Sequence, residues 1–346
     1  MTKKIIALLV LVLCLGFVSN KALALTISPV RVEISGNPGQ IVNGQMTLIN
    51  EQKVAETYYS SYLNFESQGE SGTPNFVPAK DDLGIWMSTL SSVTVPPAAQ
   101  KIVDFSITIP ANAEPGGHFA AIFWGVTPPN SGDQVGVGAK TGMLVLLTVN
   151  GNISENGGIT EFGVNNHQNF FTALPVSFYT RFTNNGSDRI KPAGDIVLKD
   201  MIGLTAAKVD GNPVQGNILP KSTRRFDSVW KGEDGATPPD QKSQGNFFDK
   251  VSYEWRNFAF GYYSANISLA YGSKNEISTA HTSFWVFPWH LTLFVIISLI
   301  LLFIIFRFVA KKYNHWVIMQ AENMLKMEEH KKEQEKNVKE ETLNKN

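Results

Sequence analysis

Histidines and acidic residues are the side chains from which a catalytic or metal site could be built, and in this chain they are scattered. Between residues 25 and 283 the histidines are His118, His167 and His281, and each stands alone in its segment. A zinc site needs closely spaced histidine or cysteine ligands, and a calcium loop needs alternating acidic residues. Neither spacing occurs, so we expect no metal and no other cofactor.

Carboxylates offer a second route to catalysis, because a glycosidase needs two of them facing one bond. Glu66, Glu70 and Asp82 are candidates, but nothing in the sequence selects two of them. Asp81 and Asp82 are neighbours, which point to opposite sides of an extended chain, so they read as solvated acids. The glycine-rich run Gly136–Gly142 lacks the glycine before its lysine that a phosphate loop requires. The sequence therefore favours a protein that is not an enzyme.

A binding role is better supported, on the longest stretch without strand character, Ser67–Gly84. Long irregular loops are uncommon in compact domains and often bind ligands. Its aromatic rings could stack on sugar rings and its acids could accept hydrogen bonds, although the rings could equally pack back onto the domain. The predicted binding residues are Phe76, Trp86, Glu70, Asp81 and Asp82. A second candidate loop is Ser131–Gly142.

The elements that must hold these loops are strands. Residues 25–283 alternate apolar and polar residues with a period of two, broken by glycine, proline and asparagine, and they show no amphipathic helical pattern of useful length. The first half predicts strands at Thr26–Ile34, Gln45–Ile49, Thr57–Phe65, Val93–Val95, Ile102–Ile109, His118–Val126 and Met143–Val149. The second half predicts them at Ile159–Val164, Val176–Thr183, Ala193–Leu198, a run ending at Leu219, Arg224–Trp230, Tyr262–Tyr271 and Ile277–Val286.

The spacing of these strands predicts an all-β fold of two tandem Ig-like antiparallel β-sandwiches. We place the boundary near Asn150–Gly158, where polar residues replace the alternation, so that the sandwiches cover residues 25–150 and 151–283. The chain has 30 Lys+Arg and 30 Asp+Glu. A net charge of zero argues against a nucleic-acid partner, which requires a basic face.

The N-terminus has the pattern of a cleavable secretory signal over residues 1–24. Lys3 and Lys4 precede an apolar run from Ile5 to Val18, and Ala22-Leu23-Ala24 offers small residues for cleavage. An uncleaved anchor is the alternative. The single cysteine, Cys14, lies in this signal, so the mature chain has no disulfide, which favours a bacterial cell envelope.

A second apolar segment, residues 286–306, is long enough to cross a bilayer as one helix. Trp285 and Trp289 stand at its entry as interfacial aromatics. Basic residues follow its exit and predict that residues 307–346 form a charged, helical cytoplasmic tail, with the N-terminal body outside the cell membrane. We interpret the tail as a solvated helix, and a partner site on it is the alternative.

Three segments carry a resemblance to a known family: Leu25-Thr-Ile-Ser-Pro-Val-Arg-Val, the region from Gly39 to Thr47-Leu-Ile-Asn50, and Glu114-Pro-Gly-Gly-His-Phe-Ala-Ala-Ile-Phe123. They resemble the Ig-like N-terminal domain of bacterial surface proteins in the WxL-interacting, peptidoglycan-binding group. The order of signal, sandwiches, membrane span and short tail is similar too. The resemblance implies that the first domain binds the cell wall and the second a partner surface protein. The opening strand also resembles that of pilus chaperones, which are soluble and periplasmic.

From these observations we expect a non-enzymatic, membrane-anchored envelope protein. Its expected partners are a cell-wall polymer or another surface protein, and the lipid bilayer through one helix. A cell-wall hydrolase or peptidase with a dispersed active site is the alternative.

Overall fold

The structure is a computed structural model that describes residues 25–128, 140–232 and 245–343, with side chains described up to Lys332. The predicted signal and most of the loop Ser131–Gly142 lie outside these residues. The chain divides into two compact units. The larger unit holds the residues up to His167, Ser177–Ser228 and Ser264–Thr282, and the smaller unit holds Gln168–Val176, Val229–Tyr263 and the residues from Ser283 onward. Because these units cut across the second predicted sandwich, the division into two domains near residue 150 stays a prediction.

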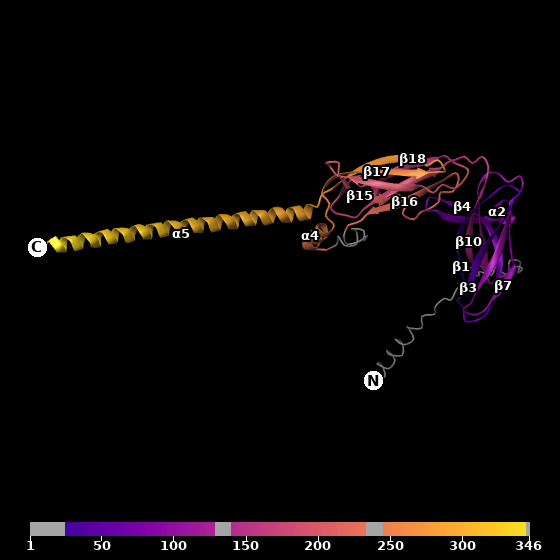
Figure 1. The fold of residues 1–346 in the computed structure, drawn as a ribbon, viewed down its shortest axis with the longest axis horizontal. Helices are drawn as coiled ribbons and strands as arrows, with labels where there is room; N and C mark the ends of the chain where they lie inside the picture. Colours follow the sequence, from indigo (N-terminus) through magenta and orange to yellow (C-terminus); the bar gives the residue numbers. More distant parts are fainter. Residues whose placement is uncertain (1–24, 129–139, 233–244, 344–346) are drawn as a thin grey trace, which may run out of the picture. The chain divides into compact units, whose positions relative to one another are not determined.

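The strands of residues 25–149 form two sheets (Figure 1). One has the order β1-β3-β8-β6, and the other has the order β2-β10-β9-β4-β5 with β7 beside β4. Their bounds are β1 Leu25–Ser28, β2 Arg31–Gly36, β3 Ile41–Asn50, β4 Glu56–Gln68, β5 Thr73–Pro78, β6 Met87–Thr89, β7 Ser92–Val95, β8 Gln100–Thr108, β9 Gly116–Gly125 and β10 Lys140–Val149.

The later strands form two further sheets, with the orders β11-β13-β16 and β12-β18-β17-β14-β15. Their bounds are β11 Gly157–Val164, β12 Phe170–Phe171, β13 Val176–Asn184, β14 Ala193–Lys199, β15 Thr205–Asp210, β16 Ser222–Trp230, β17 Gly261–Tyr271 and β18 Glu276–Val286. Phe182 and Tyr271, from different sheets, pack edge to face with ring centroids 5.3 Å apart. The prediction of a fold built from β-sandwich-type sheets is confirmed.

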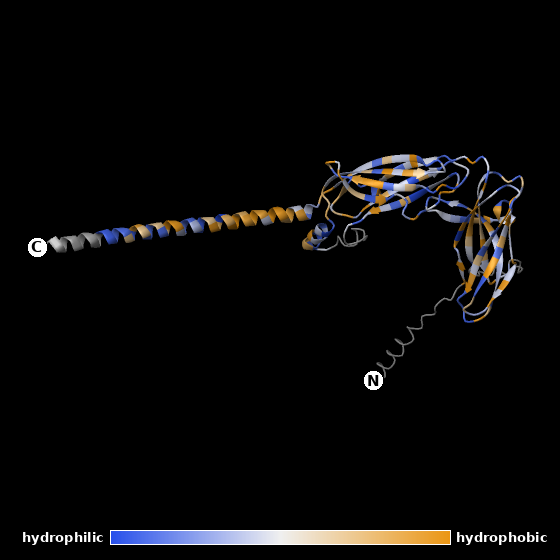
Figure 2. Ribbon diagram, in the orientation of Figure 1, coloured by the Kyte–Doolittle hydropathy of each residue, from blue (hydrophilic) through white to orange (hydrophobic). Residues whose placement is uncertain are grey.

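Hydrophobic and hydrophilic residues alternate along the strands, as the hydropathy colouring shows (Figure 2), and this alternation directs the apolar side chains to one face of each sheet. In β8, Val103, Phe105 and Ile107 are buried while their neighbours lie at the surface. The indole of Trp124 on β9 donates to the sulfur of Met46 on β3 over 3.2 Å. The first two sheets therefore face each other across one apolar layer.

The first predicted strand, Thr26–Ile34, is divided between the two sheets, which corrects the purely antiparallel prediction. β1 pairs with β3 in antiparallel fashion, and β2 pairs with β10 in parallel fashion. The break falls at Pro29, whose missing N–H cannot continue a ladder. β12 also pairs in parallel with β18.

The prediction that Ser67–Gly84 forms one irregular loop was wrong. β4 continues to Gln68 and turns into β5, with Phe65 opposite Phe76 and Gln68 opposite Thr73. Pro74 and Pro78 concealed this strand in the sequence. Both are tolerated because β5 lies at the edge of its sheet, where an N–H is not required.

Three helices are α2 Leu83–Trp86, α4 Phe247–Arg256 and α5 Trp289–Leu343. The expectation of no useful amphipathic helix in residues 25–283 was wrong for α4, which is short and begins at a capping box between Asn246 and Asp249. α5 is long and apolar enough to cross a membrane. It begins three residues later than predicted, because Val286 is still paired in β18.

Candidate functional site

Glu70, one of the predicted binding residues, is engaged within the larger unit. Its carboxylate accepts a hydrogen bond from Nε of Arg181 over 2.7 Å, and its carbonyl accepts one from the backbone N–H of Arg225 over 2.8 Å. Next to it, Gly72 lies flat against the guanidinium of Arg224, where a Cβ would stand 2.2 Å from Cζ. The turn between β4 and β5 is therefore a docking element rather than a free loop.

A second group of contacts joins β2 and β10 to the chain around Arg189. Arg189 donates to the hydroxyl of Thr148 over 2.6 Å, and Glu33 accepts from the side-chain amide of Asn217 over 2.9 Å. Burial acts to raise the pKa of Glu33, but the bond from Asn217 and the charge of Arg189 outweigh it and hold that pKa below its usual range. We call these contacts, with those of Glu70, the polar junction.

The predicted aromatic residues pack onto the sheets in different places. Phe76 is 38% exposed, and its ring lies 5.0 Å from that of Phe123 and 6.0 Å from that of Phe65. Trp86 packs against the core between the first two sheets, 4.7 Å from the ring of His118. The two rings thus have separate neighbours.

Asp82 pairs with His118, a contact that the sequence did not indicate. Nδ1 of His118 meets the Asp82 carboxylate, and Nε2 meets the carbonyl of Glu114 at 2.9 Å. Both partners are acceptors, so a doubly protonated, charged imidazole can donate to both of them. Burial acts to lower the pKa of His118, but these two hydrogen bonds outweigh it and raise that pKa. The pair fixes the start of α2 against β9.

Asp81 has a structural contact as well, because its carbonyl accepts from the side-chain amide of Asn64 over 2.7 Å. The structure thus does not gather the five predicted binding residues into one site. Glu70 belongs to the polar junction, Phe76 to one sheet face, and Asp81, Asp82 and Trp86 to the surroundings of α2. A ligand role for them stays a prediction.

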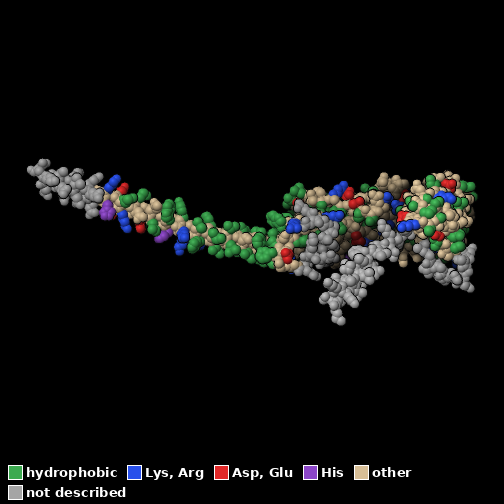
Figure 3. All heavy atoms as spheres, turned by 90° about the horizontal axis from the view of Figure 1, so that it is seen from below, with side chains coloured by type: hydrophobic (Ala, Val, Ile, Leu, Met, Phe, Trp, Pro, Cys, Tyr) green, Lys and Arg blue, Asp and Glu red, His purple; other side chains and the backbone are tan. Residues whose placement is uncertain are grey.

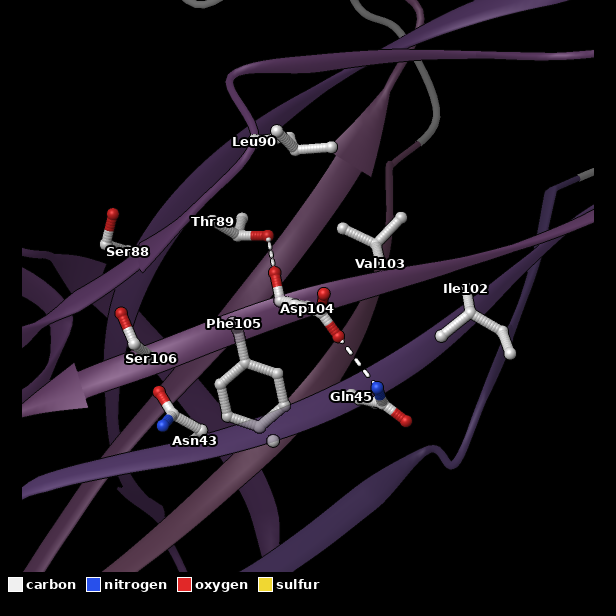
Figure 4. A pocket seen from close by; sticks show the side chains of 11 residues that line it. Asn43, Gln45, Ser88, Thr89, Leu90, Ile102, Val103, Asp104, Phe105 and Ser106 are labelled. Atoms are coloured by element: carbon white, nitrogen blue, oxygen red, sulfur yellow. Dashed lines mark hydrogen bonds between the residues drawn. The ribbon is translucent and has the colours of Figure 1, made fainter.

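A depression lies in a different place, on the outer face of β3, β8 and β6 (Figure 4). It measures about 1020 Å³. Nε2 of Gln45 donates to the Asp104 carboxylate over 2.8 Å, and the hydroxyl of Thr89 donates to the Asp104 carbonyl over 2.6 Å. The side chains that line it are Asn43, Gln45, Ser88, Thr89, Leu90, Ile102, Asp104 and Ser106. We call it the outer-face depression.

The chemistry of this depression suits an extended polar ligand. Amide, hydroxyl and carboxylate groups supply donors and acceptors, and the exposed side chains of Leu90 and Ile102 supply apolar contact. Sequence reasoning missed it because outward-facing polar residues on a strand look like ordinary solvent-facing positions. No residue pattern separates the two cases.

Among the residues that the structure describes, β6 covers only part of the edge of β8 beside the depression. β6 pairs with β8 from Phe105 to Ile107, whereas β8 begins at Gln100. The Ala99 carbonyl accepts a hydrogen bond from the N–H of Asn50 in β3, and the N–H of Ile109 donates to the carbonyl of Gln40, just before β3. Antiparallel alternation then turns the N–H and carbonyl of Ile102 away from β3.

Metal chemistry finds no support in the part of the chain that the structure describes, where no group of three His, Cys, Asp or Glu side chains could hold an ion.

Comparisons with known proteins give fold likeness alone. No family model matches the chain, and no curated protein matches it either. A chaperone and tip adhesin complex of CFA/I fimbriae is 13% identical, with a TM-score of 0.36, over 75% of this chain and 98% of that one. The class 5 fimbriae chaperone CfaA is 14% identical, with a TM-score of 0.36, over 75% and 99%. The E. coli chaperone DraB is 11% identical, with a TM-score of 0.33, over 76% and 96%.

Proposed function

We propose that this chain is a non-enzymatic, membrane-anchored envelope protein that binds a cell-wall polymer in the outer-face depression. The observation that carries the proposal is the depression itself, which is open and lined by amide, hydroxyl and carboxylate groups beside exposed aliphatic side chains. A polymer rich in hydroxyl and amide groups can exchange hydrogen bonds with this lining along its length. The resemblance to the peptidoglycan-binding group of surface proteins points to the same class of ligand.

Anchoring is assigned to α5. Its apolar segment is followed by Arg307, Lys311 and Lys312, so the positive-inside rule places the tail in the cytoplasm and the sheets outside. The sheets then face the space that holds the wall.

The test is sedimentation of the full chain, purified in nanodiscs, with isolated peptidoglycan. Gln45→Ala combined with Asp104→Ala removes two polar groups from the depression and should weaken binding roughly thirtyfold, since each ligand hydrogen bond contributes about 1 kcal/mol. Thr57→Ala combined with Thr94→Ala removes an equally exposed hydroxyl pair from the other sheet and should leave binding unchanged. Equal binding by both double variants would contradict the proposal.

A partner surface protein is the second candidate, and the uncovered edge of β8 favours it. An extended segment of such a partner could add as a strand beside Ile102, in the manner of β-augmentation. Ile102→Pro removes the N–H that faces away from β3 and should abolish this contact. Photo-crosslinking from position 102 in intact cells, read by mass spectrometry, separates the two ligands.

A further inference from the structure

Large aromatic side chains gather at the surface of the smaller unit, around the beginning of α5. Their exposed fractions run from 45% for Trp289 to 70% for Trp255. Isolated exposed apolar residues are ordinary, but a contiguous group of large ones marks an interaction surface. The members are Phe248, Trp255, Phe258, Phe260, Trp285 and Trp289, and we call them the aromatic collar.

One face of α4 carries two members of the collar. Phe248, Ser252 and Trp255 stand at helical spacings of four and three, so they share a face, and all three are exposed. On the adjacent face Glu254 is buried. The aromatic face of α4 is therefore turned outward while the helix is held from the other side.

Two contacts of Glu254 fix α4 to the first turn of α5. One carboxylate oxygen lies 2.6 Å from Nδ1 of His290, and the other accepts from the backbone N–H of Leu291 over 2.8 Å. The carboxylate thus satisfies one of the free N–H groups that begin a helix. It also meets the positive end of the helix dipole.

Ring contacts give the depth of α4 along α5. Phe247 lies 5.9 Å from the ring of His290, and Phe248 lies 6.4 Å from the ring of Phe294. Phe294 is five residues beyond Trp289, or about 7 Å along the helix axis at 1.5 Å per residue. Phe248 therefore lies level with residues of the apolar segment of α5.

The remaining members continue the collar toward the strand that leads into α5. Phe260 packs against Phe287 with ring centroids 5.6 Å apart, and Tyr262 packs against Trp285 at 5.4 Å. Hydrophobic side chains also cover the first part of α5 itself (Figure 3). The collar is thus continuous with the apolar surface of the spanning helix.

We propose that the aromatic collar lies in the headgroup region of the lipid bilayer that α5 crosses, so that α4 rests on the membrane as a second contact. This rests on the anchoring role proposed for α5. Lipid is the occupant because the collar shares the depth of Phe294, and tryptophan and other aromatic rings favour the interface between headgroups and acyl chains. A short helix with one aromatic face suits this location.

The experiment places a nitroxide label on α4 in the full chain, reconstituted in vesicles of phosphatidylcholine and phosphatidylglycerol. Ser252→Cys puts the label between Phe248 and Trp255 and removes neither ring, in a background where Cys14→Ser leaves one thiol. Power saturation should show a ratio of oxygen to nickel-chelate collisions several-fold higher than for Lys101→Cys on β8. Adding Phe248→Ser and Trp255→Ser should lower the ratio toward that reference, whereas adding Phe76→Ser, which removes another exposed ring, should not.

Carbonate extraction of the same vesicles separates this proposal from the anchoring it rests on. Release of the protein would overturn the anchoring. Retention with a label at position 252 that behaves like the one at Lys101→Cys would overturn the collar alone. Low collision with both reagents would mean that protein covers the surface, which also overturns it. If the Ser252→Cys variant fails to fold, a nitroxide label at Phe258→Cys, two residues after the end of α4, allows the same collision measurement.

Discussion

The polar junction of the larger unit and the contact between α4 and α5 in the smaller unit both use carboxylates, but in opposite surroundings. In the junction, the side chain of Glu70 is 41% exposed and shares Arg181 with Glu161. In the smaller unit Glu254 is 2% exposed, and aromatic rings surround its partner His290. The polar junction thus spreads charge over several pairs that are partly exposed, although Arg189 among them is mostly buried, and the smaller unit concentrates it in one buried pair.

The comparison separates two ways of joining elements. Exposed ion pairs contribute little individually, about 0 to 1 kcal/mol, so a junction built from them tolerates the loss of any one. A buried carboxylate must keep all its partners, because an unsatisfied buried charge or donor costs several kcal/mol. The two regions should therefore respond very differently to single substitutions.

The largest effect is expected from Glu254→Leu. The leucine leaves His290 and the N–H of Leu291 without their acceptor and should lower the free energy of unfolding of the smaller unit by about 3 kcal/mol. Thermal unfolding in nanodiscs and hydrogen exchange of the α4 amides measure it.

Two further variants serve as controls for the loss of stability expected from Glu254→Leu. Glu254→Gln keeps an acceptor for Leu291 and should lose less. Glu66→Leu removes an exposed carboxylate bonded to Asn75 and should change stability by less than about 1 kcal/mol. If both leucine variants had equal effects, the contrast between the two regions would fail.

The same contrast between buried and exposed contacts applies to the aromatic residues of the larger unit. Trp86→Ala opens the core between the first two sheets and should cost about 2 to 3 kcal/mol. Phe76→Ala removes a ring that is itself 38% exposed and should cost about 1 kcal/mol. Urea unfolding measures both. Wall binding per folded molecule should not change, and a loss of binding at unchanged stability would instead restore the ligand role predicted for these rings.

The observed strands and helices show which parts of the fold could be predicted from the sequence and which could not. Alternation located most strands, because a half-buried sheet imposes a period of two. The hairpin of β4 and β5 was missed, since prolines at an edge strand resemble a loop. The helix α4 was missed because ten residues give little periodicity.

The contacts that the predicted site residues make could not be derived from the sequence, for a physical reason. Glu70 and Asp82 were identified as polar and exposed, but their partners Arg181 and His118 are distant in sequence and come close only through the fold. The outer-face depression arises from residues on three strands, whose alternation looks like that of any solvated sheet. Local pattern carries no information about either.

An intermediate effect is expected from Arg189→Met in the polar junction. Methionine keeps most of the volume but removes the bonds to Thr148 and Glu33, which should cost about 1 to 2 kcal/mol because the arginine is mostly buried. Lys208→Met breaks an exposed pair with Asp195 and should cost less than about 0.5 kcal/mol. Equal losses in urea unfolding would show that the junction is no more than a solvated surface.

The smallest effect is a pH dependence that comes from His118. Its pKa is raised in the folded chain by Asp82 and the Glu114 carbonyl, so the folded state holds the proton more tightly than the unfolded state. The resulting stability is fully present below the unfolded pKa, about 6.5, and is lost as pH rises through the higher folded value.

As pH rises above about 6.5, stability should therefore fall in the unsubstituted chain, and it should fall less in His118→Gln. Asp82→Asn should remove most of the same slope, because the carboxylate is the charged partner of the imidazole. A slope that survives both Asp82→Asn and His118→Gln would show that the pH dependence does not come from this pair.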